Sequence, residues 1–183
     1  MLKVRDIMTR DVKACRPDDT LDDASRIMWE HDCGSVPVID VDSRVVGIIT
    51  DRDICMAVAT KHRPAGEIAV GEVISGRLHA CRPDDDVQLA MEVMRSNQVR
   101  RVVVVDGEGR IQGVLALYDL LVRGLVPSET RRSKLSGTDV LEVIRTICDS
   151  SATEAAAPRP ARRARSAATP PARAASGAYA KGR

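Results

Sequence analysis

The chain repeats the segment Gly47-Ile48-Ile49-Thr50-Asp51-Arg52-Asp53 as Gly113-Val114-Leu115-Ala116-Leu117-Tyr118-Asp119, 66 positions later. The turn Ala14-Cys15-Arg16-Pro17-Asp18-Asp19 returns at the same offset as Ala80-Cys81-Arg82-Pro83-Asp84-Asp85. Solenoid repeats are usually shorter, about 20 to 50 residues, and need three or more copies. Two long copies instead predict one pseudo-symmetric domain built from two similar units.

Length and composition indicate a soluble globular protein. The chain has 183 residues, which is enough for one domain of ordinary size with extensions. It is 44% apolar and 30% charged, and no apolar run reaches the roughly 18 residues of a membrane span. The first residues, Met1-Leu2-Lys3-Val4-Arg5-Asp6, lack the apolar core of a secretory signal. We therefore expect a cytoplasmic location and no membrane contact.

The net charge of +2 is unevenly distributed. Residues 151–183 hold seven basic side chains against Glu154 alone, so the rest of the chain is acidic. This segment is mostly Ala, Pro, Arg and Ser, and it cannot bury enough apolar surface to offset the entropy of ordering. We predict a disordered tail. Weak, salt-dependent contact of its basic side chains with nucleic acid is left open.

Each unit is predicted to be of α/β type, with the element order β-α-β-β-α. The first unit is expected to have a strand at 12–14, a helix from the N-cap Thr20 to near His31, strands at 36–39 and 45–50, and a helix at 51–59. The second is expected to have a strand at 78–80, a helix at 87–97, strands at 102–105 and 111–117, and a helix from 118. Short helical leads, 4–8 and 70–74, precede the units.

One such unit leaves an apolar face of its sheet uncovered. Two units packed sheet to sheet would bury both faces and form two related clefts at the joint. The predicted division of the chain is 1–66 and 67–126 for the two units, 127–150 for a linker and an amphipathic helix, and 151–183 for the tail.

The amphipathic helix is expected over 138–148. Its predicted apolar face consists of Val140, Leu141, Ile144, Ile147 and Cys148. A lone helix of this length is marginal in water. It must therefore dock on its own module or on a second subunit.

Five cysteines, an odd number with no C-x-x-C pair, argue against a disulfide framework or a zinc site. Buried reduced thiols are expected, with a redox thiol at Cys15 or Cys33 as the alternative. The tripeptide His31-Asp32-Cys33 has donor atoms, but adjacent side chains point in different directions and seldom share one metal. We predict no metal site.

Several segments resemble the paired CBS domain, or Bateman module. They are Asp6-Ile7-Met8-Thr9, Gly34-Ser35-Val36-Pro37-Val38, Gly47 to Ile54, Gln98 to Val104, and Gly113 to Asp119. With the internal repeat, the resemblance covers about residues 1–126 and implies that the two units are CBS domains. It is strongest to stand-alone bacterial CBS pairs, including hypoxic-response-type proteins, which have no attached catalytic or transport domain.

The resemblance implies that the G-x-x-T/S-x-x-D junction binds the ribose and phosphate of an adenosine derivative. The Thr50 hydroxyl could contact phosphate or ribose, and Asp53 could accept both ribose hydroxyls. Helix N-terminal amides around Arg52 favour an anion, and Val36 and Ile48 would flank the adenine. The alternative is that Thr50 and Asp53 form only a helix cap.

The second junction departs from this pattern. Ala116 replaces the threonine while Asp119 is kept, and Arg100 and Arg101 stand where members of the family place basic residues against phosphate. We therefore predict one better site, with Thr50 and Asp53, and one degenerate site, with Asp119. The alternative for the arginines is a pair of exposed ion-pairing side chains.

The resemblance predicts a non-enzymatic sensor. It would bind AMP, ADP, ATP or S-adenosylmethionine between the units, form a homodimer, and signal to an effector protein by conformational change. No nucleophile–base–orienter set, P-loop or metal motif indicates an enzyme. The alternatives are a protein-interaction scaffold with a vestigial ligand cleft and a weak nucleic-acid binder acting through the tail.

Overall fold

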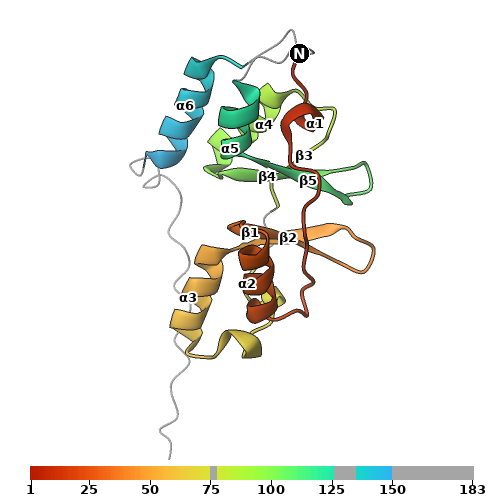
Figure 1. Cartoon of the computed structure of the whole chain (residues 1–183), viewed down its shortest axis with the longest axis vertical. Coiled ribbons are helices and arrows are strands. Elements are labelled where there is room, and N and C mark those ends of the chain that lie inside the picture. Colours follow the sequence, from red (N-terminus) through yellow and green to blue (C-terminus); the bar gives the residue numbers. More distant parts are fainter. Residues whose placement is uncertain (75–77, 126–134, 150–183) are drawn as a thin grey trace, which may run out of the picture.

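The computed structural model describes residues 1–74, 78–125 and 135–149. Two similar units are stacked with their sheets facing each other and their helices on the outside, as Figure 1 shows. This α/β arrangement of two units packed sheet to sheet confirms the predicted fold class. The predicted disordered tail, 151–183, lies outside the described residues, as does most of the predicted linker. No helix within these ranges is long and apolar enough to cross a membrane.

The helices and strands follow the predicted order with small changes. The first part of the chain holds α1 (Val4–Ile7), α2 (Leu21–Glu30), β1 (Ser35–Ile39), β2 (Val45–Thr50), α3 (Asp51–Lys61) and the short 3₁₀ helices η1 (Ala65–Glu67) and η2 (Val70–Glu72). The second holds β3 (Ala80–Cys81), α4 (Val87–Asn97), β4 (Arg101–Val105), β5 (Ile111–Ala116), α5 (Leu117–Asp119), the π-helical η3 (Leu120–Gly124) and, after the linker, α6 (Gly137–Cys148).

The strand predicted at 12–14 is wrong. Only Cys15 forms a bridge there, parallel to Val38 of β1, because the chain turns at Val12, whose amide donates to the Arg10 carbonyl. In the second unit the corresponding strand is the two-residue β3, which runs parallel to β4. The helix expected from Tyr118 is an α-helical turn, α5, that continues as the π-helical η3.

The backbone keeps the repeat in detail. β1 pairs antiparallel with β2, and β4 pairs antiparallel with β5. The register of the first hairpin shifts between Val38 and Ile39, and that of the second shifts between Val104 and Val105, at the same offset of 66. A bulge adds twist to a hairpin. The two sheets therefore share one distortion and meet as near-equivalent surfaces.

Each unit has its own core, and a third cluster joins them. Leu21, Val36 and Ile49 are fully buried in the first unit. Between the sheets, Val45, Val103 and Val114 form a smaller cluster, with partly buried apolar side chains around it: Val12, Ile39, Ile48, Leu78, Ala80, Val105 and Ile111. The joint is thus held by apolar burial from both sheets.

The lead before each unit packs on the other unit. Val4 and Ile7 of α1 are buried in the core of the second unit, and the Val4 amide donates to the Asp85 carbonyl at 3.0 Å. In return, Val70 is buried in the first core, and its amide donates to the Asp19 carbonyl at 2.8 Å. Figure 1 shows α1 beside α4 in the second unit. This exchange interlocks the two halves.

The helix α6 docks on α4 of its own chain. Val140 and Val143 are buried against the second core, while Asp139 reaches Gln88 and Glu142 reaches Arg95, both at 3.4 Å. The prediction that Leu141 and Cys148 lie on the inner face is wrong, since 65% of Leu141 is exposed and Cys148 is exposed as well. Val143, three residues after Val140, occupies the inner face instead.

Gly47 and Gly113, the glycines at the two junctions, provide a matched test of how the N-terminal lead packs on the second unit. A Cβ at Gly113 would overlap the backbone carbonyl oxygen of Thr9, whereas one at Gly47 would meet the end of the Ile74 side chain at 3.0 Å. We expect Gly113→Ala to lower the free energy of unfolding by about 2 to 3 kcal/mol. Gly47→Ala should change it by about 1 kcal/mol or less, because a side chain can move. Urea unfolding measures both, and equal losses would contradict the role of the Thr9 contact.

Two of the five cysteines are core residues, and the expectation of buried thiols is wrong for the other three, Cys33, Cys55 and Cys148, which are exposed. Cys15 and Cys81 stand at equivalent positions and are 2% and 5% exposed. Burial raises the pKa of the Cys15 thiol to about 11 and that of Cys81 to about 12. Both thiols are protonated at neutral pH, which argues against the redox alternative for Cys15.

Thiol labelling checks this protection. With a disulfide reagent at pH 8, we expect Cys15 and Cys81 to stay unmodified in the folded protein and to react in denaturant. The exposed Cys148 is the internal control and should react at once. Peptide mapping identifies each thiol, and rapid modification of Cys15 in the folded state would show that its core position is wrong.

Candidate functional site

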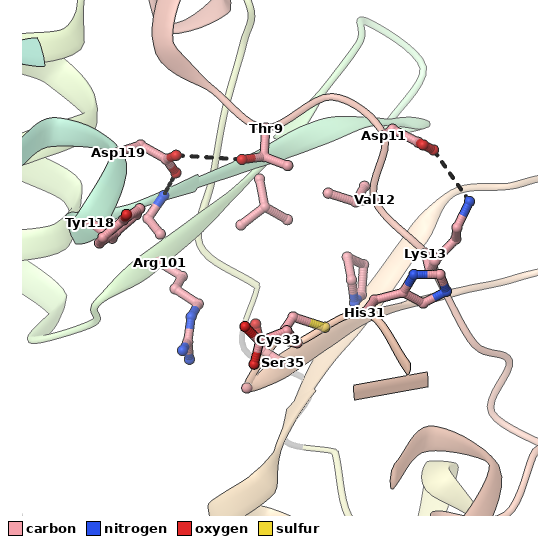
Figure 2. A pocket seen from close by; sticks show the side chains of 15 residues that line it. Thr9, Asp11, Val12, Lys13, His31, Cys33, Ser35, Arg101, Tyr118 and Asp119 are labelled. Carbon is pink, nitrogen blue, oxygen red and sulfur yellow. Dashed lines mark hydrogen bonds and ion pairs between the residues drawn. The ribbon is translucent and has the colours of Figure 1, made fainter. Parts of the chain in front are cut away.

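A cavity of about 520 Å³ lies between the two units. One wall comes from the second unit, at the end of β5 and the start of α5. The opposite wall comes from the loop that leads into β1, and the N-terminal segment from Thr9, which pairs with Val114 of β5, to Lys13 connects the two walls. Figure 2 shows these walls facing each other. The lining residues are Thr9, Asp11, Val12, Lys13, His31, Asp32, Cys33, Gly34, Ser35, Pro37, Arg101, Val114, Ala116, Tyr118 and Asp119.

Asp119 is the buried carboxylate of this cavity and is only 4% exposed. One oxygen accepts the Ala116 amide at 2.8 Å. The other accepts the Thr9 hydroxyl at 3.4 Å and forms an ion pair with Arg123 at 3.2 Å. Arg123 also donates to the Ile7 carbonyl and to the Thr9 hydroxyl, at 3.1 and 3.2 Å. A carboxylate has about four acceptor positions, so Asp119 can still accept from a bound hydroxyl group.

Arg101 supplies the positive charge. Figure 2 shows its side chain extending from β4 toward Cys33, in the loop before β1, and Ser35, the first residue of β1. The residue is half-buried, and its guanidinium has no hydrogen bond or ion pair within the described parts of the chain. A Cβ added at Gly34 would lie 3.3 Å from this guanidinium, so the glycine leaves it room. A partly desolvated, unpaired guanidinium favours an anion.

Apolar and aromatic side chains complete the walls. Val12, Pro37 and Val114 line the cavity from three segments, and the ring of Tyr118 stands at its mouth, 68% exposed. Such a mixture of apolar walls with a few placed polar groups is typical of small-molecule sites. The arrangement can hold a flat apolar group, a hydroxyl-bearing group at Asp119 and an anion at Arg101.

Two of the predicted site residues, Arg101 and Asp119, come together in this cavity, which lies at the junction predicted to be the degenerate one. The sequence reasoning missed Thr9, Lys13, Pro37 and Tyr118 as lining residues. The repeat could have indicated Tyr118, because it stands at the position equivalent to Arg52, a residue already selected. Lys13 carries no comparable signal, since only the fold brings the N-terminal segment against the second unit.

The predicted site at the first junction has the geometry of a capping box. The Thr50 hydroxyl donates to Asp53 at 2.6 Å, the Asp53 amide donates to Thr50 Oγ1 at 3.2 Å, and the Thr50 amide donates to Asp53 at 3.1 Å. This is the helix-cap alternative, although a cap leaves part of the carboxylate available. Residues 75 and 77, the sequence positions equivalent to Thr9 and Asp11, lie outside the described residues. A ligand role for Thr50 and Asp53 stays a prediction.

The other predicted residues do not line the described cavity. Val36 requires a correction: it is 0% exposed and lies in the core of the first unit, because side chains alternate along β1 and Pro37 faces the cavity instead. Ile48 packs in the cluster between the sheets. Arg52 and Arg100 are exposed.

His31, Asp32 and Cys33 all line the cavity. Over residues 1–74, 78–125 and 135–149, no group of three or more His, Cys, Asp or Glu side chains could hold a metal ion. Cys33 is exposed, in contrast to Cys15.

The comparison with known proteins agrees with this architecture. The family model of the CBS domain matches residues 4–60 and 70–124. The CBS domain-containing protein YhcV of Bacillus subtilis is 34% identical over 122 residues, which are 67% of this chain and 85% of that protein. Inosine-5'-monophosphate dehydrogenase of Methanocaldococcus jannaschii is 31% identical over 132 residues, but the match spans only 25% of the enzyme.

Solved structures show the same fold. The crystal structure of Hypoxic Response Protein I with two coordinated zinc ions is 31% identical, with a TM-score of 0.60, and the match covers 67% of this chain and 99% of that one. The CBS domain pair of protein MJ0100, in complex with 5-methylthioadenosine and S-adenosyl-L-methionine, is 23% identical, with a TM-score of 0.61 over 66% of this chain and 94% of that one. CBSX2 in complex with AMP is 23% identical, with a TM-score of 0.59 over 68% and 97%.

The internal repeat, the two interlocked units and the match of both units to one family model lead to the same assignment. The chain belongs to the CBS domain family and carries two CBS domains in tandem, at residues 4–60 and 70–124.

Proposed function

We propose that this protein is a non-enzymatic regulatory module that binds an adenosine-containing ligand between its two CBS domains. The candidates are AMP, ADP, ATP and S-adenosylmethionine. The observation that carries the proposal is the unpaired Arg101 guanidinium, which shares one cavity with the buried Asp119 carboxylate. The adenosine ligands bound by MJ0100 and AMP bound by CBSX2 support this ligand class.

Each part of such a ligand has a suitable group in the cavity. Asp119 accepts hydrogen bonds from ribose hydroxyls with the acceptor positions that Ala116, Thr9 and Arg123 leave open. Arg101 pairs with a phosphate or carboxylate. The adenine lies along apolar wall residues such as Val114.

The signal in this proposal is a change in how the two domains pack. The cavity walls belong to both domains, so a ligand that contacts both favours one arrangement over others by its difference in affinity. An effector protein then recognises the favoured arrangement. The proposal includes a homodimer and a cytoplasmic location, where adenine nucleotides are available.

The side chains of the cavity support a binding role more than a catalytic one. Among the described residues, no hydroxyl or thiol group donates a hydrogen bond to His31, and the Thr9 hydroxyl donates to Asp119 within an ion-paired cluster. An activated nucleophile needs a base within hydrogen-bond reach. The enzymes that contain this domain pair, such as the dehydrogenase above, extend far beyond the matched region.

The two aspartates at equivalent positions identify the binding junction. We expect Asp119→Asn to weaken AMP binding by about tenfold to a hundredfold, because a charge-assisted hydrogen bond contributes about 1.5–3 kcal/mol. Asp53→Asn is the matched variant at the equivalent position. It should weaken AMP binding less, because Asp53 does not line the described cavity. Isothermal titration with AMP measures both, with circular dichroism to show that each variant is folded. Loss of binding in Asp53→Asn alone would move the site to the first junction.

The two adjacent arginines test the anion contact. Arg101→Gln should weaken AMP binding by about tenfold and leave adenosine binding unchanged, since only AMP carries the phosphate. Arg100→Gln is the control, because Arg100 is exposed and does not line the cavity. Competition binding with both ligands gives the ratio of affinities. An equal loss for AMP and adenosine would show that Arg101 does not contact the phosphate.

A further inference from the structure

Arg123 connects the buried carboxylate of the ligand cavity with the N-terminal segment 4–9, which comprises the first lead and Thr9. Its Nη1 atom lies 3.2 Å from Oδ1 of Asp119, 3.1 Å from the Ile7 carbonyl oxygen and 3.2 Å from the Thr9 hydroxyl oxygen. Asp119 and Thr9 line the cavity, whereas Arg123 does not. One guanidinium outside the cavity lining therefore holds both a cavity carboxylate and this segment.

The contacts of Asp119 determine where a ligand hydroxyl can bind. Thr9 and Arg123 both reach Oδ1, while Oδ2 accepts the Ala116 amide at 2.8 Å. A carboxylate offers about four acceptor positions, so the remaining capacity lies mainly on Oδ2. Rotation of the carboxylate would break the contacts of both oxygens, because hydrogen bonds weaken steeply when they are misaligned. Arg123 and the Ala116 amide thus keep Asp119 in one orientation toward a ligand.

The first domain has Ala57 at the position equivalent to Arg123, in the regular helix α3. Its aspartate is held locally instead, by the Thr50 hydroxyl at 2.6 Å. Ala116 in the second domain has no hydroxyl, and there the Thr9 hydroxyl lies beside the aspartate. Arg123 itself belongs to the π-helical η3, and short π-helical segments are frequent at functional sites. The second junction therefore replaces a local contact by contacts with the distant N-terminal segment.

We propose that Arg123 is a positioning residue that couples ribose recognition at Asp119 to the docking of segment 4–9. This deepens the proposed function and rests on it. The docked segment holds Arg123, and Arg123 keeps the carboxylate oriented before a ligand arrives, so less freedom is lost on binding. Coupling between two sites is reciprocal. A ribose bound at Asp119 therefore stabilises the docked segment by the same free energy.

The first measurement compares AMP with 2′,3′-dideoxyadenosine monophosphate, which lacks both ribose hydroxyls. Isothermal titration of the full wild-type chain should give an affinity about tenfold higher for AMP, as one charge-assisted hydrogen bond provides. Arg123→Met keeps an unbranched side chain but removes the charge. It should lower this ratio to about threefold or less and leave the affinity for the analogue unchanged. A purely structural role of Arg123 would lower both affinities by the same factor.

The second measurement follows hydrogen exchange of the Thr9 amide, which donates to the Val114 carbonyl at 2.9 Å and reports on the docking of segment 4–9. In the ligand-free protein this amide should exchange about fivefold faster in Arg123→Met than in wild type, because the tie from the guanidinium is lost. AMP should slow the exchange in wild type. It should not slow the exchange in Arg123→Met.

Arg10→Met is the matched control. Arg10 is exposed and donates to the Arg5 carbonyl at 2.8 Å, so this variant loses the same charge and a similar contact to the same segment, but no contact to Asp119. It should keep the wild-type ratio of affinities and the slowing of exchange by AMP. Circular dichroism shows that each variant is folded.

The outcomes separate this coupling from the ligand proposal. A wild-type chain that does not bind AMP would overturn both. A wild-type chain that binds AMP, together with an Arg123→Met variant that keeps the ratio of affinities or the slowing of Thr9 exchange, would overturn the coupling alone. Equal losses for AMP and the analogue in Arg123→Met would also overturn it, since they show a structural role.

Discussion

The exchange of the two short leads between the domains is the constraint on which the rest of the structure depends. The amides and carbonyls of Thr9 and Val114 pair with each other at 2.9 Å in both directions, and α1 buries Val4 and Ile7 in the second core. The chain that continues from Thr9 must then cross the joint to reach the first domain. This crossing supplies one wall of the ligand cavity, so the interlock that stabilises the pair also builds its site.

Burial of Asp119 is tolerated because of the same crossing. A buried carboxylate is costly unless it is paired and hydrogen-bonded. Here Thr9 comes from the lead, and Arg123 comes from the π-helical segment and also holds the Ile7 carbonyl. In the first domain the position equivalent to Arg123 is Ala57, and Asp53 is half-buried with Thr50 as its partner. The two junctions therefore share a backbone but differ in electrostatics.

The outer faces of the two domains also differ from each other. The second domain is closed by α6, whose Val140 and Val143 complete its core, whereas the first domain presents Trp29 and a hollow. The repeat gives the two domains equivalent backbone frameworks. Different residues at equivalent positions, such as Arg95 and Trp29, then give each domain different contacts. This asymmetry leaves the two domains with one backbone framework but with different exposed surfaces.

The sequence by itself determined the repeat, the element order and most helix and strand bounds, because these follow from local periodicity, caps and turns. It also indicated Arg101 and Asp119, since the offset of 66 and the family resemblance are properties of the chain alone. Only the tertiary structure decided that each lead packs on the opposite domain and that Val36 faces a core while Pro37 faces the cavity. It also decided that Trp29 is exposed. These features depend on which surfaces meet across the joint, and contacts between residues far apart in the chain leave no local pattern in it.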